Sequence, residues 1–279
     1  MVGNRRIMKI IVNNTEYTIK MTGKGEPIVF LHGFTGDHST WGEIIPFLSN
    51  SFQCITIDLL GHGQTTTLSQ PDDYTMEKSA SDIVLILKKL NIDKAHLIGY
   101  SMGGRLALGF TILHPSLVKT LILESASPGL KLVKEREKRR EADAALARRI
   151  KQEGVAAFVD YWENIPLFRT QKRLPTHMQE RIRKQRLKNS EKGLINSLLG
   201  MGTGQQPSYW EKLHEVQCGV LLLTGSLDEK FNCIALEMEK ILPNVQYIQV
   251  ENAGHAIHVE QSKKFGTIVK EFLLHKGGS

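Results

Sequence analysis

Six short apolar runs recur along the chain, separated by polar and helix-type stretches. They occupy residues 27–31, 53–58, 95–100, 119–124, 219–223 and 245–250. Their apolarity is continuous rather than alternating, which is typical of strands buried on both faces. Between the second and third runs, residues 75–90 begin with a candidate cap, Thr75, and repeat apolar side chains at helical spacing. This alternation predicts a mostly parallel sheet flanked by helices.

The strand–helix rhythm stops after the fourth run and resumes near residue 211. From 127 to 210 the sequence is charged and helix-type, punctuated by Pro128, Pro166, Pro175 and a glycine-rich stretch at 200–204. We therefore predict an α/β core formed by residues 1–126 and 211–279, with a helical cap (lid) inserted at 127–210. No internal repeat or low-complexity segment competes with this division.

Composition limits the class of protein further. A chain of 279 residues can form one large core with a modest insertion. No apolar run approaches the roughly 18–20 residues that a membrane span requires. The basic start is followed by polar residues rather than by a signal-peptide core. With three cysteines and no CxxC pair, a disulfide framework is not expected. We predict a cytoplasmic protein without membrane insertion, and a monomer or weak homo-oligomer.

The net charge of +7 is concentrated in one internal segment. Between residues 131 and 192 there are 18 Lys or Arg against 9 Asp or Glu, whereas the remainder has 18 against 20. A basic surface suits nucleic acid, an acidic membrane or a polyanionic small molecule. Confinement to one internal segment, with no basic tail, favours a partner local to that segment, and no nucleic acid is expected. For most of these charges a solvated helix face is the simpler interpretation.

A candidate nucleophile lies at the end of the third apolar run. Residues 99–103 read G-Y-S-M-G, with Ser101 at the centre, between a predicted strand and a helical run expected to begin near Gly104. Glycines let the backbone make the sharp turn that exposes a serine at a helix N-terminus. There the N–H of Met102 can face a developing negative charge. A glycine-rich turn with an incidental serine is the alternative.

A serine nucleophile needs a base and a group that orients the base. Of ten histidines, His255 is best placed, because it follows the last predicted strand in Ala-Gly-His. Asp228 follows the preceding strand, and both residues are expected at the carboxyl edge of the sheet, where ligands bind. The order Ser, Asp, His along the chain is the one this fold uses. We predict a Ser101–His255–Asp228 triad.

Other loop residues are assigned smaller roles. The Phe34 N–H, in the loop 32–36, is the expected second oxyanion donor beside Met102. His32 and His62 are expected to structure loops, and His258 either orients His255, touches substrate or is structural. The glycines at 200–204 do not open a helix after a strand, and H-E-x-x-H is absent. No cofactor and no metal are predicted.

Over essentially its whole length the sequence resembles the α/β-hydrolase superfamily. Within it, the sequence is similar to the 2-succinyl-6-hydroxy-2,4-cyclohexadiene-1-carboxylate synthases of menaquinone (vitamin K2) biosynthesis. The segments that carry this narrower resemblance are 99–105 (GYSMGGR), 127–130 (SPGL), 162–168 (WENIPLF), 202–207 (GTGQQP) with Trp210, 228–231 (DEKF) and 253–260 (AGHAIHVE).

The resemblance implies an α/β-hydrolase fold and a lyase that eliminates pyruvate without attack by water. The serine would abstract a ring proton and the oxyanion hole would hold the charge on a succinyl carbonyl. By motif matching it implies substrate contacts from Tyr100, Arg105, Arg139, Trp162, Arg186 and Lys230. The substrate that the resemblance implies is a small polycarboxylate, and planar guanidinium groups bind carboxylates bidentately. Arg136 or Arg140 could replace a cap arginine in this role, or the arginine could lie on a solvated helix face.

Two other functions use the same sequence features. An ester or carbon–carbon bond hydrolase would employ the same triad with water, and would have no special need for Arg105. A non-catalytic ligand-binding module could also retain the scaffold, since fold does not fix function. Such a module would usually have lost part of the triad, whereas this chain has all three members.

Overall fold

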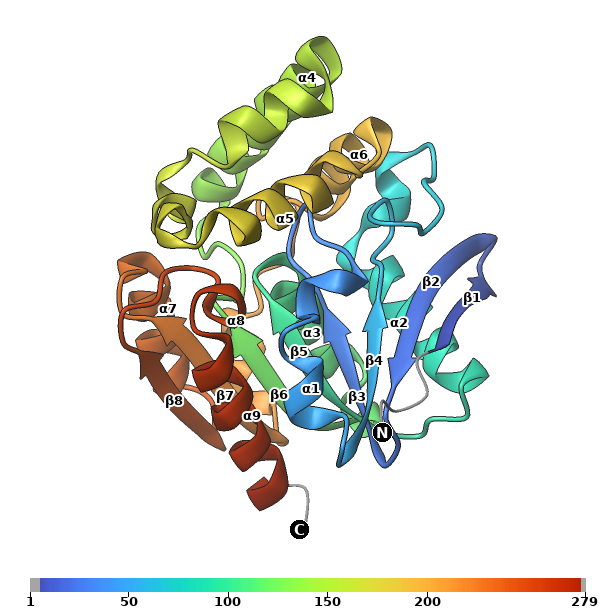
Figure 1. Ribbon diagram of the computed structural model, residues 1–279, viewed down its shortest axis with the longest axis vertical. Helices are drawn as coiled ribbons and strands as arrows, with labels where there is room; N and C mark the ends of the chain where they lie inside the picture. Colours follow the sequence, from blue (N-terminus) through green and yellow to red (C-terminus); the bar gives the residue numbers. More distant parts are fainter. Residues whose placement is uncertain (1–5, 277–279) are drawn as a thin grey trace.

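A sheet of eight strands forms the centre of the computed structural model, which describes residues 6–276 (Figure 1). The strand order is β1-β2-β4-β3-β5-β6-β7-β8, and only the β1–β2 and β2–β4 pairs are antiparallel. The strands are β1 Arg6–Val12, β2 Thr15–Thr22, β3 Glu26–Leu31, β4 Phe52–Ile57, β5 Ala95–Tyr100, β6 Val118–Glu124, β7 Gly219–Gly225 and β8 Val245–Val250. The architecture is the predicted α/β-hydrolase fold.

The six predicted runs are strands β3 to β8, with ends that differ by at most two residues. The hairpin β1–β2 was missed, because its exposed outer strand lacks a continuous apolar run. Its turn residues, Asn13 and Asn14, both have positive φ, as a two-residue hairpin turn requires. The expectation of burial on both faces is wrong for β8. That strand forms an edge of the sheet and is only partly buried.

Helices cover both faces of the sheet and form two apolar clusters with it. One face packs against α2 Met76–Lys89, α3 Met102–Leu113 and α7 Glu229–Glu239. The other packs against α1 Ile45–Leu48, α8 Ile257–Glu260 and α9 Ser262–Lys276. Helix α2 begins after the predicted cap Thr75, whose side chain accepts from the Lys78 N–H. Short 3-10 turns complete the core: η1 His38–Trp41, η2 Pro71–Tyr74, η3 Pro115–Leu117 and η5 Trp210–Glu215.

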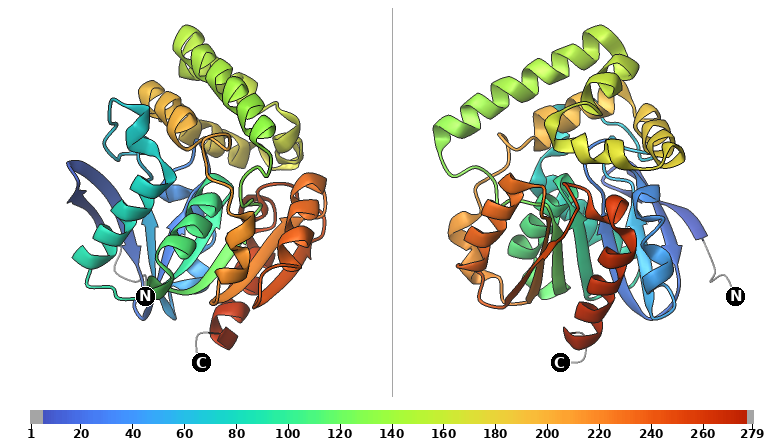
Figure 2. Two further views of the ribbon diagram at one scale, coloured as in Figure 1. Left: turned by 180° about the vertical axis from the view of Figure 1, so that it is seen from behind. Right: turned by 60° about the vertical axis from the view of Figure 1, so that its left-hand side comes forward.

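The segment between β6 and β7 lies above the carboxyl edge of the sheet (Figures 1 and 2). It contains α4 Val133–Trp162, η4 Pro166–Arg173, α5 Thr176–Leu187 and α6 Glu191–Met201. Helix α4 is interrupted at Gly154, where φ is +79°. A small apolar cluster joins α4 and α6 and contacts Phe34 of the core. We refer to residues 127–210 as the cap, keeping the predicted boundaries. Among the described helices, none is long and apolar enough to cross a membrane.

Candidate active site

The turn between β5 and α3 holds Ser101 in a strained conformation. Its φ of +50° lies in the left-handed region, which non-glycine residues rarely adopt. Close packing explains the glycines on either side. A Cβ on Gly103 would lie 2.1 Å from the Leu31 carbonyl oxygen, and one on Gly99 would lie 2.4 Å from the Gly103 carbonyl oxygen. Helix α3 therefore begins at Met102, two residues earlier than predicted, with Ser101 at its N-terminus.

Asp228 and His255 lie on loops that follow β7 and β8 and are hydrogen-bonded to each other. The Leu227 N–H donates to the Ala253 carbonyl at 2.9 Å, and the Ser226 N–H donates to the Val250 carbonyl at 2.9 Å. These bonds hold the two loops together at the carboxyl edge of adjacent parallel strands. The register of the sheet thus fixes the spacing between the acid and the imidazole.

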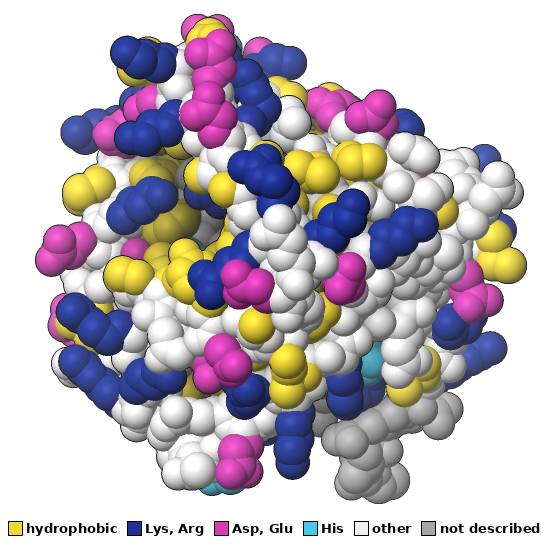
Figure 3. Space-filling model, turned by 90° about the horizontal axis from the view of Figure 1, so that it is seen from above, with side chains coloured by type: hydrophobic (Ala, Val, Ile, Leu, Met, Phe, Trp, Pro, Cys, Tyr) yellow, Lys and Arg dark blue, Asp and Glu magenta, His cyan; other side chains and the backbone are white. Residues whose placement is uncertain are grey.

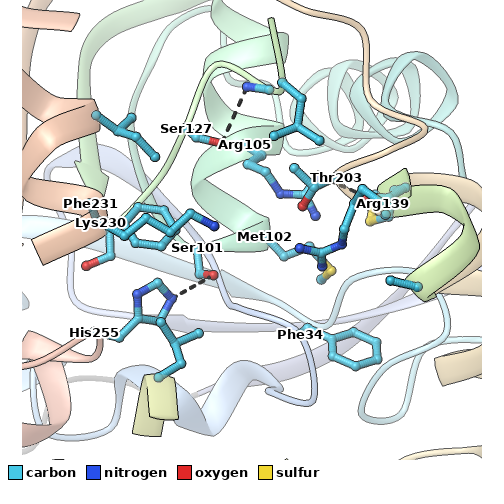
Figure 4. A pocket seen from close by; sticks show the side chains of 18 of the residues that line it. Phe34, Ser101, Met102, Arg105, Ser127, Arg139, Thr203, Lys230, Phe231 and His255 are labelled. Carbon is cyan, nitrogen blue, oxygen red and sulfur yellow. Dashed lines mark hydrogen bonds between the residues drawn. The ribbon is translucent and has the colours of Figure 1, made fainter. Parts of the chain in front are cut away.

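The structure brings Ser101, His255 and Asp228 into one hydrogen-bonded chain. His255 Nε2 lies 3.0 Å from Ser101 Oγ (Figure 4). His255 Nδ1 lies 2.7 Å from Asp228 Oδ2. Because a carboxylate only accepts, Nδ1 carries the proton and Nε2 is free to accept the serine proton. Asp228 and His255 are buried, whereas Ser101 is partly exposed to a cavity. This arrangement can generate an alkoxide-like serine oxygen.

Two backbone amides near Ser101 are free to stabilise negative charge. Met102 is the first residue of α3, so its N–H has no acceptor within that helix. The Phe34 N–H donates to no acceptor in the part of the chain that the structure describes. The Phe34 ring packs edge-on against Trp162 and His62, which holds the loop after β3 beneath the cap.

A cavity of about 600 Å³ opens above Ser101, between the sheet edge and the cap. Its volume is in the range of small-molecule sites. Seen from above, the hollow has hydrophobic walls, and Lys and Arg side chains gather around it (Figure 3). Of the residues predicted to act at the site, the cavity is lined by Phe34, Tyr100, Ser101, Met102, Arg105, Arg139, Trp162, Lys230 and His255.

Two arginines point into this cavity in different electrostatic states (Figure 4). Arg139, on α4, is partly neutralised, because its Nε donates to Asp143 Oδ1 at 2.8 Å. Arg105 is 9% exposed and forms no ion pair with any described residue. Burial, followed by the nearby charge of Arg139, lowers the pKa of Arg105 to about 10. The charge of Asp143 opposes this shift, although Asp143 forms no ion pair with Arg105. A buried cation without a direct ion-pair partner attracts a carboxylate.

Lys230 and Tyr100 also line the cavity, in different surroundings. Lys230 is exposed at the start of α7, and partial desolvation with the nearby Arg139 lowers its pKa. Tyr100 is buried beneath His255, with ring centroids 5.3 Å apart. Burial and the charge of Glu124 raise the pKa of Tyr100, so it stays a neutral phenol.

Arg186 faces a second cavity of about 290 Å³ rather than the first. Phe34, Tyr100 and Phe168 line both cavities, which therefore adjoin each other. Arg186 is buried, its Nη2 donates to Gln171 Oε1 at 3.1 Å, and its guanidinium lies over the Phe168 ring. It forms no ion pair with a residue between 6 and 276. Helix periodicity in α5 could not have shown which cavity this side chain enters.

His258 and Glu124 form a buried pair behind the nucleophile. Glu124 accepts from the backbone N–H of His258 at 3.0 Å and from its Nδ1 at 2.8 Å, while the Glu124 carbonyl accepts from the Ser101 N–H. Glu124 thereby ties the segment after His255 to the serine turn. Glu124 was not among the predicted site residues, although one signal for it is present in the sequence: it is an acidic residue that ends a buried strand.

One cluster in the described chain has potential metal ligands, namely Asp37, His38 and Asp58. Its oxygens are already hydrogen-bond acceptors. Asp37 Oδ1 accepts from the Ser39 N–H and hydroxyl, and Asp58 accepts from His38 Nδ1 and the Gln64 N–H. We interpret the cluster as the structural support of the loop after β3.

His32 and His62 are neutral loop-structuring residues beside this support. His32 donates from Nδ1 to the Gly33 carbonyl and accepts the Leu59 N–H at Nε2. The His62 ring lies 5.2 Å from that of His32. Burial, and then the neighbouring His32, lowers the pKa of His62 to about 3.

The low pKa of His62 predicts a pH-dependent stability. An unfolded histidine titrates near 6.5, so between about pH 6.5 and 3 the unfolded chain binds the extra proton and the free energy of unfolding falls as pH falls. In His62→Asn this component disappears. We expect the variant to lose roughly 1–2 kcal/mol less stability than the parent between pH 6.5 and 5. Urea unfolding at several pH values measures the free energy of unfolding of both proteins. If it fell equally with pH in the parent and in His62→Asn, the prediction would be contradicted.

Comparison with known proteins agrees with this fold and site. Residues 26–262 match the family model described as alpha/beta hydrolase fold. With its eight-stranded sheet and its serine at the strand–helix turn, the chain therefore belongs to the α/β-hydrolase family.

Within this family the chain is similar to a set of synthases. It is 48% identical over 248 residues, 89% of this chain and 90% of the relative, to a Bacillus subtilis protein provisionally named as a 2-succinyl-6-hydroxy-2,4-cyclohexadiene-1-carboxylate synthase. A Citrobacter koseri protein of that name is 31% identical, covering 85% of this chain and 89% of the relative. The structure of MenH from S. aureus superposes with a TM-score of 0.89 at 37% identity, covering 93% and 99% of the two chains.

Proposed function

We propose that this protein is a lyase that eliminates pyruvate from 2-succinyl-5-enolpyruvyl-6-hydroxy-3-cyclohexene-1-carboxylate, giving 2-succinyl-6-hydroxy-2,4-cyclohexadiene-1-carboxylate. One observation carries the proposal: a Ser–His–Asp chain opens into a cavity lined by a buried arginine that forms no ion pair with a described residue. The named relatives support it. A hydrolase of neutral esters has no use for a buried cation in its cavity.

The triad supplies the base for this reaction. Ser101 Oγ removes a ring proton from the substrate while His255 Nε2, 3.0 Å away, takes the serine proton. Asp228 holds the imidazole in the required tautomer and stabilises the imidazolium that forms. The serine forms no acyl bond, and water does not attack.

The amides of Phe34 and Met102 stabilise the intermediate charge. When the ring C–H bond breaks, its electron pair is delocalised onto the succinyl carbonyl oxygen, next to these two donors. The pair then moves through the ring and breaks the C–O bond to the enolpyruvyl group. Enolpyruvate leaves, takes up a proton and becomes pyruvate, while the ring becomes a conjugated diene.

The basic residues around the site suit a small polycarboxylate. Arg105, Arg139 and Lys230 line the same cavity as Ser101. Arg186 offers a fourth positive charge in the second cavity, beyond Tyr100 and Phe168. We propose that the carboxylates of one substrate are shared between these cations, with Trp162 forming an apolar wall. Of the positive charges in the cap, Arg139 and Arg186 then have a role in binding.

Product formation tests the proposal against the hydrolase alternative. We expect purified protein mixed with the enolpyruvyl precursor to release one pyruvate per diene formed, and to turn over an aryl acetate far more slowly. Pyruvate is followed with lactate dehydrogenase and the diene by its absorbance. Rapid ester hydrolysis without pyruvate release would refute the lyase and favour an esterase with the same triad. Binding of the precursor without either reaction would favour a non-catalytic module.

A further inference from the structure

Arg105 is held from one side only. Its two hydrogen bonds to the protein both leave from Nη1, to the Met201 carbonyl at 2.9 Å and to Gln206 Oε1 at 2.8 Å. Nε and Nη2 make no hydrogen bond within residues 6–276, and the side chain lines the cavity. A guanidinium carries five donors in a fixed fork. Holding Nη1 therefore fixes the plane in which the remaining donors meet a ligand.

Gln206 lies in the segment that leads from the cap back to the core, and its own position is fixed by packing and a backbone hydrogen bond. It is 1% exposed, and its N–H donates to the Gly202 carbonyl at 3.1 Å. Gly129, with φ of +97°, packs beside it, and a Cβ there would lie 3.2 Å from Gln206 Nε2. Because arginine only donates, the atom facing Arg105 is the amide oxygen. The Nε2 atom is buried without a partner among the described residues.

Gln206 differs from the partner of the other arginine in the cavity because its side chain carries no charge. The other arginine in the cavity, Arg139, is held by a carboxylate, Asp143, which cancels part of its charge. Arg105 is held by a neutral amide and a backbone carbonyl, which orient it without forming an ion pair. Asp143 acts on Arg105 only through space, without a direct contact. A glutamate in place of Gln206 would fit the same space and form a buried ion pair.

We propose that Gln206 is a positioning residue that orients Arg105 while keeping its positive charge available for a substrate carboxylate. This rests on the proposed function only in requiring a carboxylated ligand. Gln206 touches no reacting atom. Its effect on binding therefore passes entirely through Arg105.

A double-mutant cycle between these two residues tests the proposal by calorimetry. The probe is the aromatic diacid 4-(2-carboxyphenyl)-4-oxobutanoate, which resembles the product ring and needs no turnover. We expect Gln206→Glu to weaken binding about tenfold or more, because the new carboxylate competes for Arg105. Gln206→Met, which removes the acceptor but adds no charge, should weaken it roughly threefold. In an Arg105→Ala background, both substitutions at Gln206 should have no effect on affinity.

The neighbouring glutamine provides a matched control. Gln205 lies in the same loop but is exposed, so Gln205→Glu and Gln205→Met should leave diacid affinity unchanged. Near-UV circular dichroism checks that each variant is folded. Equal losses of affinity with and without Arg105 would show that Gln206 is merely structural and overturn the proposal. Unchanged affinity in folded Gln206→Glu would also overturn it. Because the experiment measures binding and not turnover, it tests the role of Gln206 independently of whether the protein releases pyruvate.

Discussion

Ser101→Ala should reduce pyruvate elimination by roughly 10³- to 10⁶-fold, with little change in substrate affinity. In the proposed mechanism the Oγ atom removes the ring proton, and His255 Nε2 lies 3.0 Å from that oxygen. Removing one oxygen from a partly exposed side chain creates no buried cavity. Single-turnover measurement of diene formation separates this chemical loss from any change in binding.

Asp228→Asn is the matched test of how the serine is activated. The amide can occupy the same position 2.7 Å from His255 Nδ1 but favours the wrong tautomer, so Nε2 can no longer accept the serine proton. A loss comparable in order to that of Ser101→Ala supports a base formed by the whole triad. If Ser101→Ala retained near-parental turnover, the mechanism would be wrong and another base would have to be sought.

Arg105→Ala should lower kcat/KM for the carboxylated precursor by about 10²- to 10³-fold, or roughly 3–4 kcal/mol. The side chain is buried and carries a positive charge that forms no ion pair with a described carboxylate. Its loss removes a charge-assisted contact and leaves the Gln206 amide oxygen without its donor. Initial-rate kinetics of pyruvate release, with thermal unfolding measured in parallel, distinguish lost recognition from lost stability.

Two further variants serve as controls for the Arg105→Ala measurement. Arg105→Lys keeps the charge but not the planar fork, so we expect it to recover only part of the activity. Arg148→Ala removes an exposed cap arginine outside both cavities and should change kcat/KM little. An Arg105→Ala enzyme indistinguishable from the parent would remove the principal reason for preferring a lyase over an esterase.

The core of this protein could be predicted from the sequence because its signals are local. Buried parallel strands require continuous apolar runs, and those runs identified β3 to β8. The serine turn requires glycines at fixed spacing, and the order of Ser101, Asp228 and His255 follows from the order of the strands that carry them. The hairpin β1–β2 was missed because an exposed edge leaves no such run.

What only the tertiary structure decided depends on contacts between distant segments. A helix pattern places Arg139 and Arg186 on helices of the cap, but it cannot say that one enters the cavity of Ser101 and the other a second cavity behind Phe168. Nor can it show that Gln206, 101 residues along the chain, accepts from Arg105.

The physical reason is that local and long-range information differ in kind. A few consecutive residues determine strand burial and the serine turn, because their side chains set the local backbone conformation and the preference for burial. The direction of a cap arginine is imposed by how the cap helices pack over the sheet edge. Sequence therefore determined the chemistry available to this protein, and the packing of the cap determined where its positive charges meet a ligand.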